Sequence, residues 1–106
     1  MDDFKWSDKE KKVARRAFDA ALQCERDALL AEFKQKAAEA KDFDDLWELQ
    51  DFLKKKRTDL DLKYDYRYSQ LVRVFGFLIR EKRITEADLV GLAEEKLDYI
   101  RRIISF

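Results

Sequence analysis

Residues 44–64 read DDLWELQDFLKKKRTDLDLKY, and this stretch decides the fold class. It contains neither Pro nor Gly, and its leucines recur at the spacing of one helix face. The pattern predicts one long helix over about 45–82, and a break near 58–61 is the alternative. The apolar face of this helix continues beyond the quoted stretch and consists of Leu46, Leu49, Leu53, Leu60, Tyr64, Leu71, Phe75 and Leu78.

A second helix precedes this segment. Ser7 and Glu10 form an S-x-x-E capping box, which marks the start of a helix over about 8–40. Its apolar face is rich in Ala, so a neighbouring helix can approach closely, and Cys24 is expected there as a small core residue. The acidic residues just before 45–82, Asp42 or Asp44, are suited to cap the central helix.

A third helix follows. Thr85 and Asp88 repeat the capping pattern ahead of an apolar face that runs over about 86–104. Gly91 falls inside this helix, where we expect it to mark a close contact with Gly76 or with the central helix. The three segments predict an all-α, elongated protomer with three main helices, in which the second and third pack as a hairpin.

The composition limits the function. The chain has 106 residues, enough for one domain spanning 1–106, and 43% of them are charged, against about 25% in an ordinary domain. Lys plus Arg and Asp plus Glu both number 23, and this zero net charge argues against a nucleic-acid partner. The absence of His removes the usual general base and zinc ligand, so we expect that the chain is not an enzyme.

Location follows from three further features. No apolar run approaches the length of a membrane span, and the N-terminal MDDFKWSDKE is too acidic for a signal peptide. The single Cys24 cannot form an internal disulfide, which favours the cytoplasm.

The central helix carries more apolar surface than a thin three-helix protomer can hide. Such a protomer usually buries its remaining stripe in a symmetric dimer. We therefore predict an antiparallel helical homodimer whose interface contains Leu46, Leu49, Leu53 and Leu60.

A polar arc lies beside this stripe. Trp47, Gln50, Asp51, Lys54 and Arg57 fall within roughly 120° of the helix circumference. A Trp and an Arg on a rigid helix, next to an acidic residue, have the composition of a protein-binding hot spot. In the alternative interpretation Trp47 packs at the dimer edge, and the charged residues form a solvated i,i+4 lattice.

The motifs of the chain resemble a known family. The segment 44–53, followed by Lys56-Arg57, Lys63-Tyr64-Asp65 and Arg67, closely resembles the fluorescence recovery protein family of cyanobacteria. The resemblance covers nearly the whole chain, because the N-terminal part also agrees at the same offsets: Trp6-Ser7, Glu10, Ala14, Phe18, Ala21, Glu25, Leu29 and Leu30.

The resemblance implies a dimeric, all-helical regulator of photoprotection without a cofactor. Members of this family bind the photoactivated, red form of the orange carotenoid protein, chiefly through its C-terminal domain. They speed its return to the orange form and help it to leave the phycobilisome, which implies a place near the thylakoid surface. The functional Trp, Asp and Arg of the family fall on Trp47, Asp51 and Arg57.

The chain departs from the family pattern at two positions. Gln50 stands where His is common, which keeps hydrogen bonding but removes titration, and Arg73 occupies a position that is often aromatic. These departures leave room for a second hypothesis, that the chain is a dimeric adaptor or scaffold for a different client protein.

Overall fold

The computed structural model describes residues 4–105, so the ends of the predicted 1–106 domain, residues 1–3 and 106, lie outside it. The all-α prediction is confirmed. The described helices, in chain order, are α1 (Asp8–Glu39), α2 (Phe43–Lys63), α3 (Leu71–Arg80), the 3-10 helix η1 (Glu86–Leu89) and α4 (Glu94–Ile104).

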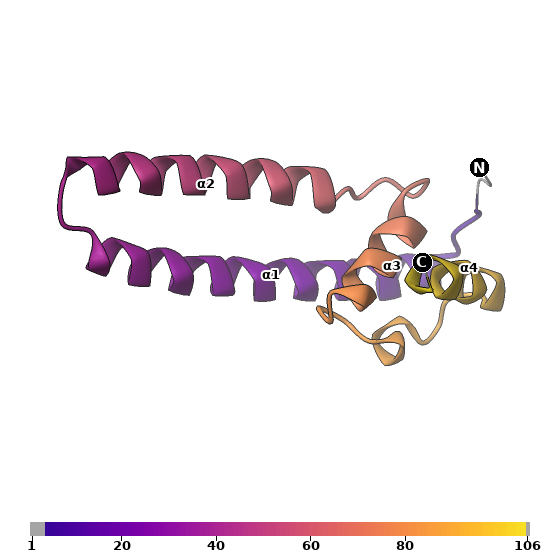
Figure 1. The fold of residues 1–106 in the computed structure, drawn as a ribbon. Helices are drawn as coiled ribbons and strands as arrows, with labels where there is room; N and C mark the ends of the chain where they lie inside the picture. The colour runs from indigo at the N-terminus through magenta and orange to yellow at the C-terminus, as the bar shows by residue number, and fades with distance from the viewer. Residues whose placement is uncertain (1–3, 106) are drawn as a thin grey trace.

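The molecule is elongated, with principal extents of 53 × 25 × 23 Å. Figure 1 shows α1 and α2 as a long antiparallel hairpin, with α3, η1 and α4 gathered at one end, beside the start of α1. We call residues 22–63 the stem, the turn between α1 and α2 its tip, and the remaining described residues the head.

The start of α1 agrees with the sequence. Ser7 Oγ accepts a hydrogen bond from the Glu10 backbone N–H at 3.1 Å, and Ser7 N–H donates to Glu10 Oε1 at 3.0 Å. The helix predicted over 8–40 is therefore confirmed to within one residue. Burial along α1 nevertheless ends at Ala21, because beyond it only α2 lies alongside, and Cys24 is exposed rather than in the core.

The single central helix predicted over 45–82 is wrong. It is divided into α2 and α3 by a non-helical link at 64–70. Side-chain contacts hold this link: Tyr64 Oη donates to Glu25 Oε1 at 2.6 Å, and the Tyr64 ring meets Phe18 edge-on at 5.4 Å. These tertiary contacts with α1 override the helical pattern of the local sequence.

The continuous third helix predicted over 86–104 is also wrong. The chain turns between η1 and α4, where Gly91 has a φ of +114°. An L-residue rarely adopts this conformation, so Gly91 interrupts the helix instead of lying inside it. A Cβ at Gly91 would lie 2.9 Å from Val13 Cγ2, so the close contact of this glycine is with α1.

The buried core lies in the head. It is formed by one face of α1, six of the ten residues of α3, and residues of η1 and α4, while α2 contributes no buried residue. The fully packed hydrophobic side chains in it are Ala14, Ala21, Leu71, Val74, Phe75, Leu78, Leu89 and Ile100.

Gly76 lies where α3 and α4 approach most closely. A Cβ at this position would lie 2.6 Å from Ile103 Cγ2 and 2.9 Å from Ile103 Cβ. The predicted contact of Gly91 with Gly76 or the central helix is therefore wrong, because Gly91 lies against α1 and Gly76 against α4.

We expect Gly76→Ala to lower the free energy of unfolding by about 1–2 kcal/mol, because overpacking outweighs the better helix propensity of Ala. Urea unfolding measures the change. Adding Ile103→Ala removes most of the clash, so the double variant should lose less stability than the two single losses added together. A gain in stability on Gly76→Ala alone would show that the helices move apart without cost.

Candidate functional site

One face of the stem carries a large groove. Its volume is about 930 Å³, and four leucines form its apolar walls: Leu22 and Leu29 from α1, and Leu53 and Leu60 from α2. No residue of α2 is buried, and Leu53 is 39% exposed. The groove is thus an apolar surface that the protomer by itself leaves open to solvent.

Three of the five predicted partner-binding residues line this groove. Gln50, Lys54 and Arg57 lie along it beside the leucines, whereas Trp47 and Asp51 do not line it. The Trp47 side chain is 61% exposed, and Asp51 is also exposed. Gln50, Lys54 and Arg57 therefore border the groove, and Trp47 and Asp51 are exposed on α2 outside its lining.

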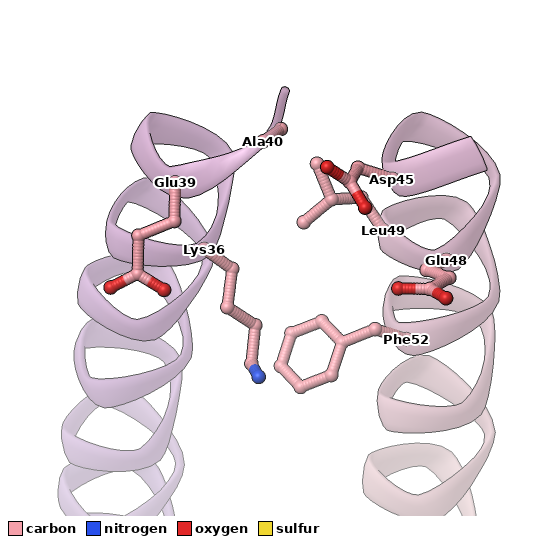
Figure 2. Close-up of a pocket in the computed structure, with 7 residues that line it drawn as sticks. All are labelled: Lys36, Glu39, Ala40, Asp45, Glu48, Leu49 and Phe52. Carbon is pink, nitrogen blue, oxygen red and sulfur yellow. The ribbon is translucent and has the colours of Figure 1, made fainter. Parts of the chain in front are cut away.

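The predicted dimer residues divide between two sides of α2. Leu53 and Leu60 line the groove, and Leu46, which is 49% exposed, lines a neighbouring hollow at the tip with Phe43. Leu49 instead lines a separate pocket of about 270 Å³ between the helices, shown in Figure 2. Leu46, Leu53 and Leu60 are thus available to another molecule, while Leu49 faces α1.

Figure 2 also shows what joins the two helices near the tip. Lys36 extends from α1 toward the Phe52 ring on α2, with its Nζ 5.1 Å from the ring centroid. Lys56 Nζ lies 5.7 Å from the same ring. Lys56 belongs to α2 itself, so the contact between Lys36 and Phe52 and the half-buried Leu49 join the helices here, and no residue of α2 is buried.

A polar network joins the stem to the head. Glu25 Oε1 accepts hydrogen bonds from Lys63 Nζ at 2.7 Å and from Tyr64 Oη at 2.6 Å, and Arg83 Nε lies 3.5 Å away. Lys63 also pairs with Glu81 at the end of α3. Glu25 and Lys63 are 38 residues apart in the chain, so no local pattern in the sequence indicates this pair.

This network shifts the ionisation of its members in opposite directions. Burial alone would raise the pKa of Glu25, but hydrogen bonds from Lys63 and Tyr64 and the nearby cations lower it. Burial and the hydrogen bond to Glu25 raise the pKa of Tyr64. At neutral pH Glu25 is therefore a charged acceptor and Tyr64 a neutral donor.

Arg73, the second departure from the family pattern, lies on the outer side of α3. Its Nε donates to Gln70 Oε1 at 3.0 Å, and its guanidinium carbon lies 5.6 Å from the Phe77 ring centroid. Arg80 flanks the same ring at 5.5 Å. The guanidinium groups of Arg73 and Arg80 thus both lie near the Phe77 ring in this part of the head.

Within residues 4–105, no group of three or more His, Cys, Asp or Glu side chains is arranged to hold a metal ion. None of the helices in that range is long and apolar enough to cross a membrane.

The stem is a helical hairpin with an open, leucine-lined face. Comparison with known proteins explains it. The family model described as "Photoprotection regulator fluorescence recovery protein" matches residues 6–104. The chain belongs to the fluorescence recovery protein family.

Individual relatives agree with this family over the same range. The fluorescence recovery protein of Synechocystis sp. PCC 6803 is 39% identical over 98 residues, which cover 92% of this chain and 90% of that relative. The fold matches the structure of the fluorescence recovery protein of Fremyella diplosiphon with a TM-score of 0.90 and 38% identity, over 96% of this chain and 100% of that one. The Synechocystis structure gives the same TM-score of 0.90 at 37% identity, again over 96% of this chain and 100% of that one.

Family membership makes the chain a regulator connected with recovery from photoprotection.

Proposed function

We propose that the chain is a non-enzymatic regulator that binds the photoactivated, red form of the orange carotenoid protein and accelerates its return to the orange form. It contacts the C-terminal domain of that client, and the return to the orange form ends quenching at the phycobilisome. The observation that carries this proposal is the family match over residues 6–104, together with 39% identity to a fluorescence recovery protein.

We also propose that the chain works as one helical domain that forms an antiparallel homodimer through the groove face of the stem. Three leucines of α2 that are exposed or half-buried support this. Leu46, Leu53 and Leu60 are spaced seven residues apart, so two antiparallel α2 helices centred on Leu53 bring Leu46 of each copy to Leu60 of the other. A two-fold interface requires such self-complementarity.

The residues at the border of the groove are the proposed client site. Trp47 provides an exposed aromatic anchor, and Asp51 and Arg57 provide charge-assisted hydrogen bonds, with Gln50 and Lys54 beside them. The alternative, in which Trp47 packs only at the dimer edge, predicts that its loss weakens the dimer and leaves client recovery unchanged per dimer.

The mechanism needs no bond chemistry. A protein that speeds reversion must bind the path between the red and orange states more tightly than the red state itself. A rigid helix that already holds its polar groups in place suits this role, because those side chains lose little conformational freedom when the client binds. The chain then releases the orange form and acts on another client molecule.

We expect Arg57→Leu and Asp51→Leu to slow client recovery at least about tenfold, the effect of losing roughly 1.4 kcal/mol of binding to the reversion path. Helicity should not change, because both side chains are exposed. The dimer mass of each variant is measured alongside, because Arg57 also lines the groove of the proposed dimer. The measurement is the dark absorbance recovery of photoconverted client with each variant.

The matched control is Lys55→Leu, which makes the same type of change at another exposed position of α2. It should keep the recovery rate of the unchanged chain. Equal rates for all three variants would remove the site assignment while leaving the proposed activity intact.

A further inference from the structure

Glu25 lies behind the wall of the groove. Tyr64 is one of the residues that line the groove, whereas Glu25 lines a second pocket, of about 360 Å³. Leu29 and Leu60 line both spaces, so these two leucines separate the groove from the pocket. The Tyr64 hydroxyl donates to Glu25 Oε1 at 2.6 Å. A carboxylate on the far side of the wall therefore holds a side chain of the groove.

The helix that carries the client site has few other polar attachments to α1. No residue of α2 is buried, and near the tip its Phe52 ring meets a lysine of α1. Within residues 4–105, each hydrogen bond that joins α2 or its C-cap Tyr64 to α1 ends on Glu25, and the bond from Lys63 Nζ measures 2.7 Å. Glu25 is therefore the polar anchor of the head end of α2.

The surroundings of Glu25 strengthen this anchor. Its side chain is only 18% exposed, and hydrogen bonds to a carboxylate are about twice as strong as those between neutral groups. Lys63 also pairs with Glu81 at the end of α3, and Arg83 Nε lies 3.5 Å from Glu25 Oε1. One carboxylate of α1 thus joins the end of α2 to the residues that follow α3.

We propose that Glu25 is a positioning residue for the client site: it holds the end of α2 against α1 and thereby sets where Arg57 lies along the groove. This inference deepens the proposed function and rests on it. Arg57 precedes Lys63 by six residues, which is about 9 Å along a helix. A displacement of about 1 Å at that distance lowers a rate, because the polar groups must meet the reversion path in place.

The test is the dark recovery of photoconverted orange carotenoid protein with Glu25→Leu, over a range of chain concentrations. Leu has a similar volume but accepts no hydrogen bond from Lys63 or Tyr64. We expect the rate at saturating amounts of the chain to fall about fivefold, while the half-saturating amount changes less than about twofold. A variant that only loses folded molecules does the reverse, because it raises the amount needed and keeps the saturated rate.

Tyr64→Phe is the milder variant and carries the test if Glu25→Leu does not fold. It keeps the ring that meets Phe18 edge-on and removes only the hydroxyl that donates to Glu25. We expect its saturated rate to fall about twofold, again without a rise in the half-saturating amount.

A double-mutant cycle with the client site separates positioning from a general loss of structure. In the Arg57→Leu chain, Glu25→Leu should lower the saturated rate by less than about twofold, because no guanidinium is left to displace. The matched control is Glu32→Leu, since Glu32 is exposed on α1 and lines the same pocket. This control should keep the rate of the unchanged chain.

The outcomes separate this inference from the proposed function. Saturated rates of Glu25→Leu and Tyr64→Phe equal to that of the unchanged chain, a loss on Glu25→Leu that adds in full to that of Arg57→Leu, or a monomer mass for Glu25→Leu would overturn this inference alone. An unchanged chain that does not accelerate recovery would overturn the proposed function as well.

Discussion

Leu53→Glu is expected to turn the dimer into a monomer, with a dissociation constant at least about 100-fold higher, which corresponds to about 2.7 kcal/mol. In the two-fold arrangement Leu53 of one copy meets Leu53 of the other, so each substitution places two carboxylates together at the centre of an apolar seam. Burial of an unpaired charge costs several kcal/mol. Light scattering over a range of concentrations measures the mass directly.

The chain offers a matched control on the same helix. Leu62 is 74% exposed and does not line the groove, so Leu62→Glu should keep the dimer mass. Since no residue of α2 is buried, hydrogen exchange in α2 should also accelerate in the Leu53 variant, while amides of the head core stay protected. Dimer mass in the Leu53 variant, or monomers in both variants, would refute the proposed seam.

Glu10→Gln is expected to destabilise the head by about 3–5 kcal/mol, because it leaves Lys96 as an unpaired buried charge. The Glu10 carboxylate joins two helix starts. It accepts from Ser7 N–H at the start of α1, from Ala93 N–H at the start of α4 at 2.9 Å, and from Lys96 Nζ at 2.8 Å. Urea unfolding measures the loss.

The double variant Glu10→Gln/Lys96→Met separates the charge from the packing. It removes both charges and keeps similar volumes, so it should recover much of the lost stability. If the single variant loses less than about 1 kcal/mol, the ion pair does not hold the head together.

The same carboxylate gives the head a defined acid sensitivity. The hydrogen bonds from Lys96, Ala93 and Ser7, opposed by burial, lower the pKa of Glu10 from 4.5 to about 2. Its contribution is therefore complete above pH 4.5 and is lost as the pH falls toward 2, by about 3 kcal/mol. Unfolding free energies of the Glu10→Gln variant should vary less over that range.

Local signals in the sequence identified the ends of α1 and the starts of α2 and η1. The capping box of Ser7 and Glu10 spans four residues, and Asp42 and Thr85 likewise form their capping hydrogen bonds with residues three positions away. The end of η1 also had a local signal in Gly91, since glycine tolerates positive φ. The helical spacing of its apolar neighbours nevertheless predicted a continuous helix through Gly91, so the turn between η1 and α4 was missed.

The break between α2 and α3 had no local signal. The segment 58–75 contains neither Pro nor Gly, and the link at 64–70 lies outside the alternative break considered at 58–61. Its cause is the contact of Tyr64 and Tyr66 with α1, from partners such as Phe18 that are far away in sequence. Helical periodicity describes one helix face and contains no information on such contacts.

The candidate site could be predicted in part. Helical spacing placed Gln50, Lys54 and Arg57 together, and they share the groove. It also grouped Leu49 with the other leucines, although Leu49 faces α1, because spacing alone does not reveal which edge of an apolar stripe meets the neighbouring helix. Whether these residues bind a client stays a prediction.

The measurement that tests the central claim most directly is the dark absorbance recovery of purified orange carotenoid protein after conversion to its red form by blue light, with and without this chain. We predict faster recovery at amounts of the chain well below those of the client, since the chain is released after each reversion. Unchanged recovery for carotenoid proteins from several sources would contradict the proposed function and favour a dimeric adaptor for another client.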